Sequence, residues 1–176
     1  MIKIIIFLLI SIGIAKFSWP SLLKIQSRDF YRFFALEFLL ILVLVTGTFW
    51  FYHPFSFFQL ISWALFAAAI FTGYRGFTEL RNLGKPTDKI VIESTTILVT
   101  SGIYKYIRHP LYGALIFIGT GCFFKNPSLL ATSLFFVSTV FFYATALTEE
   151  RESILKFGEE YAVYMDRTRM FVPYIF

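Results

Sequence analysis

Five long apolar stretches occupy most of this 176-residue chain. They cover residues 2–17, 33–52, 55–77, 110–124 and 128–147. A helix that crosses the hydrocarbon core of a bilayer needs about 20 apolar residues, and helices satisfy their own backbone hydrogen bonds there. The composition agrees, because 57% of the residues are hydrophobic and only 15% are charged, which is outside the range of ordinary soluble domains. We therefore expect an all-α membrane protein with about five transmembrane helices.

The stretches divide a single predicted integral membrane domain, residues 1–176, into four parts. We expect three N-terminal spans in residues 1–77, a cytoplasmic connector in 78–109, a helical hairpin in 110–147 and a cytoplasmic tail in 148–176. The first stretch is interpreted as a retained helix, because no small-residue cleavage site follows Ala15. In the tail, Leu155 and Phe157 belong to one apolar face, and Gly158 is expected to interrupt the helix. The tail is therefore predicted to form a C-terminal amphipathic helix on the cytoplasmic surface.

Lysine and arginine residues fall almost entirely on one side of the predicted spans. Of the 16 basic residues, all but Lys3 and Lys125 lie in the first connector, the third connector and the tail. Cytoplasmic loops carry such an excess of positive charge. The C-terminus is therefore predicted to be cytoplasmic, in the plasma or inner membrane if the organism is prokaryotic and in the endoplasmic reticulum if it is eukaryotic.

Three further features of the sequence, namely a cysteine, an acid within a span and a β-branched segment, allow less specific interpretations. Cys122 is the single cysteine, so an internal disulfide and a cysteine metal cluster are excluded, and no metal site is predicted. Glu37 is the one acid within a predicted span, so it is either a functional carboxylate or a partner of Arg32 near the interface. Residues 90–99 are rich in β-branched side chains and are predicted to be extended, as a strand or a lid.

The fourth and fifth stretches are separated by a connector so short that they are predicted to form an antiparallel hairpin. Their far ends then meet on one membrane face. One end carries Arg108 and His109, and Pro110 suits the first helical turn and places His109 at the capping position. The other end carries Glu149 and Glu150.

These two ends have complementary chemistry. The amide groups and positive dipole end of the helix starting at Pro110 favour a carboxylate or phosphate, whereas the two glutamates favour an ammonium or a sulfonium. The residues alone leave two interpretations open. The ends form either a pocket for a zwitterion, or a set of interfacial charges with an ordinary helix cap.

Ordered motifs in the last 79 residues resemble a known family. The chain contains LVTSGIYKYIRHPLYG at 98–113, Glu149-Glu150, and KFGEEYAVYMDRTRMFVP at 156–173. This order is similar to the signature of the isoprenylcysteine carboxyl methyltransferase and phospholipid methyltransferase superfamily. Ile103 stands where that family usually has proline, which makes the preceding turn less rigid but removes no polar group.

The resemblance implies an S-adenosylmethionine site between the last two helices and the tail. It assigns Tyr104, Arg108, His109 and Tyr112 to the cofactor's amino-acid end, Glu149 and Glu150 to its acidic partner pair, and Tyr161 and Tyr164 to the closing tail. Glu150 and His109 are the candidate catalytic residues. The implied partners are membrane lipids and a lipophilic or lipidated substrate, and no nucleic acid is expected.

The implied reaction is methyl transfer to a lipophilic acceptor, for example a prenylcysteine carboxylate or the amine of a lipid headgroup. A carboxylate needs no base, whereas an amine must first lose a proton, for which Glu150 or His109 is the candidate base. Two other classes of function remain open from the sequence. One is a membrane reductase of the sterol reductase type that uses NADPH, and the other is a noncatalytic membrane scaffold.

Overall fold

The computed structural model describes residues 2–22, 24–85 and 95–173. The named elements of the described residues are all helices, and an isolated parallel bridge joins Ile107 to Arg169. The elements, in chain order, are α1 (Ile2–Leu22), α2 (Arg28–Thr46), η1 (Gly47–Phe49), α3 (Phe57–Leu83), η2 (Gly102–Lys105), α4 (Pro110–Lys125), α5 (Leu129–Phe157) and α6 (Glu159–Arg167).

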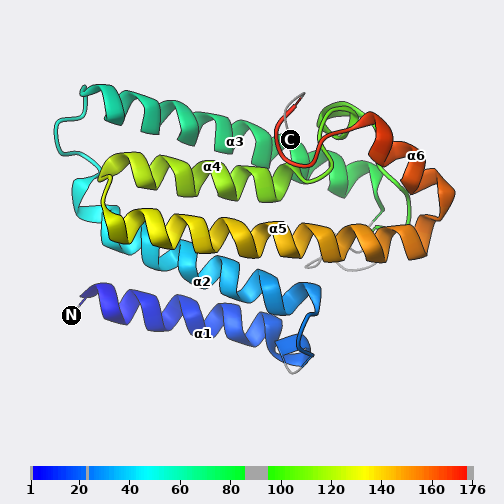
Figure 1. The fold of residues 1–176 in the computed structure, drawn as a ribbon, viewed down its shortest axis with the longest axis horizontal. Coiled ribbons are helices and arrows are strands. Elements are labelled where there is room, and N and C mark those ends of the chain that lie inside the picture. The colour runs from blue at the N-terminus through cyan, green and yellow to red at the C-terminus, as the bar shows by residue number, and fades with distance from the viewer. Residues whose placement is uncertain (1, 23, 86–94, 174–176) are drawn as a thin grey trace. The chain divides into compact units, whose positions relative to one another are not determined.

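Each of the five apolar stretches forms a helix, as predicted (Figure 1). Among the described residues, three segments are long and apolar enough to cross a membrane, namely Arg28–Phe49, Phe57–Leu83 and Leu129–Phe157. Helix α4 is equally apolar, but its 16 residues extend only about 24 Å. The protein is thus an all-α membrane protein, and the crossing of the bilayer by α1 and α4 stays a prediction.

Two helices extend well beyond the apolar stretches that predicted them. Helix α3 continues to Leu83, and α5 continues to Phe157. Hydropathy identifies only the apolar part of a helix. The backbone hydrogen bonds of the helix continue into polar residues until a residue that terminates the helix. At the end of α5 this is Gly158, whose φ of 61° is accessible to glycine at little cost. Gly158 interrupts the helix as predicted, and α6 follows directly.

The chain divides into two compact units, with residues 1–66 and 116–149 in the first and residues 67–115 and 150–176 in the second. In the first unit, α4 ends at Lys125 and α5 begins at Leu129, so the predicted hairpin is present (Figure 1). Helix α5 packs on α2, where the Ser138 hydroxyl donates to the Ala35 carbonyl at 2.9 Å. Small residues allow helices to approach each other closely in a membrane, where burial of apolar surface contributes little to helix association.

Polar residues of the first unit lie at the start of α2 and in its interior. Arg32 pairs with Asp29 at the start of α2, and the alternative roles of Glu37 stay predictions. Glu37 is buried, and its Oε1 atom has no hydrogen-bond partner among the described residues. Cys122 is buried and free, as predicted. Half of the predicted strand or lid, residues 90–94, lies outside the described ranges, and residues 95–99 form no helix or named strand.

Candidate functional site

The second unit contains the start of α4, where the local sequence determines the geometry. Helix α4 begins at Pro110, which lacks an amide hydrogen and has a φ suited to a first turn. The preceding His109 occupies the capping position, and its carbonyl accepts a hydrogen bond from the Gly113 amide at 2.9 Å. Only 4% of the His109 surface is exposed. The imidazole is therefore fixed at the start of the helix, inside the unit.

Glu150, in the C-terminal part of α5, contacts Arg108 and His109. Its Oε1 atom lies 2.6 Å from Nε of Arg108 and 3.3 Å from Nε2 of His109. The Arg108 and Glu150 side chains are only 10% and 6% exposed, so this is a largely desolvated ion pair. The sequence prediction that basic and acidic groups about 40 residues apart would meet is thus confirmed for Glu150. Glu149 is half-buried and belongs to the first unit, and its part in a donor site stays a prediction.

A C-terminal segment, Thr168–Phe171, runs along the residues before α4, and we call it the strap. The Arg169 amide donates to the Tyr106 carbonyl at 3.0 Å, and the Arg108 amide donates to the Arg169 carbonyl at 2.8 Å. The His109 amide donates to the Met170 carbonyl at 3.0 Å. The amides of Arg108 and His109 thus bind the strap, and an anion at the first amides of α4 itself stays a prediction.

The Arg108 side chain also holds the strap and the end of α6. Its Nη1 atom donates to the Thr168 carbonyl at 2.6 Å and to the Met165 carbonyl at 3.2 Å. A cation at a helix C-terminus satisfies carbonyl groups that have no partner within the helix, and it opposes the negative end of the helix dipole. One guanidinium therefore connects the start of α4, the end of α5 and the end of α6.

The predicted tyrosines are buried around this cluster. Tyr104 donates to the Gly76 carbonyl at 3.3 Å, and its own carbonyl accepts from the Tyr164 hydroxyl at 2.7 Å. Burial raises the pKa of Tyr164 above its ordinary value, so the phenol stays a hydrogen-bond donor. The Tyr161 and Tyr164 rings meet edge to face with centroids 5.7 Å apart. The Tyr112 ring stacks on His109, also at 5.7 Å.

Sequence reasoning missed two parts of this arrangement. The first is the strap, since nothing in its composition indicates pairing with residues some 60 positions earlier. The second is Glu79 on α3, which accepts from the Ile103 amide at 2.6 Å and pairs with Arg75 at 2.6 Å. The i, i+4 spacing of Arg75 and Glu79 was the available signal, together with Gly102, whose φ is 60° and whose missing side chain leaves room for the Glu79 carboxylate.

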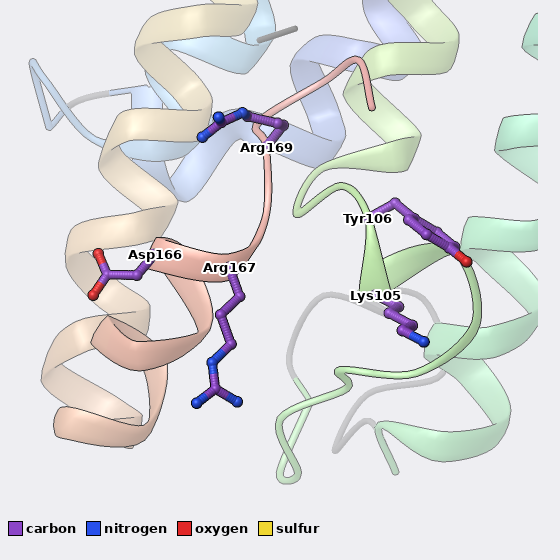
Figure 2. A pocket seen from close by; sticks show the side chains of 5 residues that line it. All are labelled: Lys105, Tyr106, Asp166, Arg167 and Arg169. Atoms are coloured by element: carbon purple, nitrogen blue, oxygen red, sulfur yellow. The ribbon is translucent and has the colours of Figure 1, made fainter. Parts of the chain in front are cut away.

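A shallow pocket of about 200 Å³ opens beside the strap (Figure 2). It is lined by Lys105, Tyr106, Asp166, Arg167 and Arg169, none of which was a predicted site residue. Within the described ranges, no group of three or more His, Cys, Asp or Glu side chains is placed to hold a metal ion.

Known proteins that resemble this chain include two kinds of methyltransferase. Methanethiol S-methyltransferase 1 of Bradyrhizobium diazoefficiens is 33% identical over 100 residues, covering 54% of this chain and 34% of that protein. Protein-S-isoprenylcysteine O-methyltransferase of Mus musculus is 34% identical over 112 residues, covering 61% of this chain and 36% of that protein. Protein-S-isoprenylcysteine O-methyltransferase B of Arabidopsis thaliana is 34% identical over 110 residues, covering 61% and 51%. The alignments thus span about a third to a half of these relatives, and no solved structure matches the chain significantly.

The family comparison covers the cluster itself. The model of the isoprenylcysteine carboxyl methyltransferase family matches residues 69–156, which is half of the chain. This range includes Arg108, His109 and Glu150, and it ends before Tyr161 and Tyr164 on α6. The chain belongs to the isoprenylcysteine carboxyl methyltransferase family.

Proposed function

We propose that this protein is a membrane methyltransferase that takes its methyl group from S-adenosylmethionine, and that Arg108, His109 and Glu150 bind the donor's charged amino-acid end. The observation that carries the proposal is the buried contact of one carboxylate with a guanidinium and an imidazole. Buried charges are costly unless they are paired, and clusters of interacting titratable groups are common at functional sites.

The chemistry of these side chains fits the donor, which carries a carboxylate, an ammonium and a sulfonium. A guanidinium suits a carboxylate because its planar fork matches the two oxygens. Both contacts of Glu150 with the basic side chains fall on Oε1, so Oε2 is the oxygen to which a ligand cation would bind. The stacked rings of His109 and Tyr112 provide aromatic faces of the kind that bind positively charged ligands.

The donor supplies an activated methyl group, so the protein's task is to align the acceptor and exclude water. In this proposal Arg108 orients the donor's carboxylate, and Glu150 holds a positive group. Tyr104 and Tyr164 support the start of α4 through their hydrogen bond. They act on the geometry of the site and not on the reacting atoms.

Two acceptor classes follow from the relatives. The names of those relatives specify a carboxyl oxygen of an isoprenylcysteine and the thiol of methanethiol. A carboxylate is ionised at neutral pH and needs no base, whereas a thiol with a pKa of about 8.5 must lose a proton. For a thiol or an amine, we propose His109 as the base, since its ring can donate through Nε2 to Glu150 while the unprotonated nitrogen accepts. A lipid headgroup amine is a third proposed acceptor, and like a thiol it needs a base to remove its proton.

The decisive experiment incubates membranes that contain the protein with methyl-labelled S-adenosylmethionine, and then separates lipid, protein and small-molecule fractions. The labelled fraction identifies the acceptor class, and membranes carrying the His109→Ala variant should remain unlabelled. For a carboxylate acceptor the rate should be nearly constant above about pH 5, whereas for a thiol it should rise towards about pH 8.5. Binding of NADPH and not of S-adenosylmethionine to purified protein would contradict the proposal and favour a reductase.

A further inference from the structure

The pocket beside the strap is built by two chain segments that are paired through their backbones. The bridge between Ile107 and Arg169 holds the segment before α4 against the strap. Side chains alternate in extended chain, so Arg169 is exposed between the buried Thr168 and Met170, and Arg167 is exposed at the end of helix α6. The pocket residues are therefore displayed on the surface by a fixed backbone.

The pocket carries an excess of positive charge. Lys105, Arg167 and Arg169 are exposed, Asp166 is the one acid in the lining, and within the described residues none of these four side chains is in an ion pair. In Figure 2, Lys105 extends from the segment before α4 and Arg167 from the end of α6, and the Asp166 carboxylate points away from both. Lys105 lies over the Tyr106 ring, 6.0 Å from its centroid, so an anion bound between the two segments would meet these cations without breaking an ion pair.

The size and place of the pocket restrict the anion. About 200 Å³ is below the roughly 300–1,000 Å³ of pockets for whole drug-sized ligands, which favours one compact charged group. The pocket also lies immediately before the apolar helix α4 in the chain, and Tyr106 is 45% exposed. Aromatic and basic residues next to an apolar helix are typical of the headgroup layer, where phosphate is the abundant anion.

We propose that Lys105 and Arg167 bind the phosphate of an anionic phospholipid headgroup, and that the positive charge of Arg169 adds to the attraction. Arginine binds phosphate through parallel N–H groups, and lysine adds a point charge. This site is separate from the proposed methyl-donor cluster, and its existence does not require the methyltransferase proposal. It would hold the strap, and with it the start of α4, at the membrane surface.

The test uses the full-length protein in a nonionic detergent, with bound lipid counted by native mass spectrometry. Dioleoyl phosphatidylglycerol is compared with dioleoyl phosphatidylcholine, which has the same chains and no net charge. The double variant Lys105→Gln/Arg167→Gln should bind phosphatidylglycerol about 25-fold more weakly, from about fivefold per basic residue. Asp166→Asn should bind it more tightly. Arg81→Gln removes an exposed cation of the same unit outside the pocket, and it should change nothing.

Several results would overturn the proposal. These are equal binding of the two lipids, an unchanged affinity in the double variant, or an equal loss in Arg81→Gln. Inorganic phosphate in millimolar excess is added as a competitor, and complete displacement of the lipid by it would assign the site to free phosphate and reject the lipid. Competition by S-adenosylmethionine would instead make the pocket part of the methyl-donor site. Failure of the protein to bind S-adenosylmethionine would reject the proposed function and leave this site intact.

Discussion

Glu150 holds two basic side chains with a single oxygen atom, at 2.6 Å from Arg108 and 3.3 Å from His109. Residue identities predicted this meeting because a short connector forces two helices to return on themselves. They did not predict that the basic and acidic groups would neutralise each other, nor that Arg108 would also bind the carbonyls of Met165 and Thr168. Such contacts depend on side-chain direction, which sequence spacing does not determine.

Substitution of Glu150 by glutamine removes the negative charge of the side chain and nearly keeps its shape, so it tests the contribution of the charge alone. The variant leaves Arg108 buried without a counter-charge, and breaking a buried pair in this way costs about 3–5 kcal/mol. We expect a lower thermal unfolding midpoint in detergent and at least a tenfold loss of S-adenosylmethionine affinity, measured by calorimetry. Glu152→Gln, an exposed site on the same helix, is the matched control. Wild-type affinity in Glu150→Gln would remove this carboxylate from the donor site.

Tyr164 gives a pH-dependent contribution to stability. Burial raises the pKa of its phenol above the ordinary value of 10.0, so the folded protein keeps this proton at pH values where the unfolded chain loses it. The contribution is therefore complete below pH 10 and is lost as the pH rises further. Tyr164→Phe should cost about 1 kcal/mol at neutral pH but should show a shallower loss of stability above pH 10. Tyr74→Phe, an exposed tyrosine, is the control, and identical alkaline profiles for all three proteins would contradict the assignment.

At the scale of elements, local signals were reliable where one residue type decides the backbone. Pro110 starts α4, Gly158 ends α5, and the hairpin turns between Lys125 and Leu129, all as predicted. The ends of α3 and α5 were predicted too early because polar residues continue a helix without adding hydropathy. The strap was not predicted at all, since its pairing with residues 106–109 is held by backbone hydrogen bonds that any side chains permit.

The close contact between Gly113 and the strap should affect donor binding. A Cβ atom at this position would lie 3.1 Å from the Phe171 carbonyl oxygen, so alanine requires the strap to move by a few tenths of an ångström. We expect Gly113→Ala to lower S-adenosylmethionine affinity by roughly three- to tenfold, because small displacements at a site that depends on alignment are costly. The helix itself should remain intact, since alanine is the better helix former.

The control for this variant is Gly13→Ala on α1, where a Cβ atom would have no neighbour within 4 Å. It makes the same change in helix propensity without touching the strap. If both variants bind the donor as tightly as the wild type, the strap does not position the site.

At the scale of the whole molecule, composition alone was sufficient to predict the class of protein. A chain that is 57% hydrophobic is more apolar than typical soluble domains, and the exposed apolar side chains of α1, including Ile2, Ile4 and Leu9, agree with a lipid environment. The fold does not determine which side of the membrane each terminus faces. This orientation is tested by measuring whether each terminus is accessible to protease from one side of the membrane.

The C-terminus should face the cytoplasm, because all but two of the 16 basic residues fall on the predicted inner side. A protease-cleavable tag after Phe176 should survive protease added to sealed, right-side-out vesicles and be removed after permeabilisation. A tag before Met1 should behave oppositely if five helices cross the membrane. Cleavage of the C-terminal tag in sealed vesicles would reject this orientation.

Lys125, at the tip of the hairpin, is one of the two exceptions to this charge distribution, and the structure shows what binds it. Its ammonium lies 3.4 Å above the Trp63 ring and donates to Gln59 at 2.8 Å and to the Trp50 carbonyl at 3.3 Å. All three partners precede Lys125 in the chain, so a ribosome completes them before the lysine is synthesised. If α4 and α5 cross the bilayer as predicted, the groups that bind the Lys125 ammonium are therefore already in the chain when that charge has to be moved across.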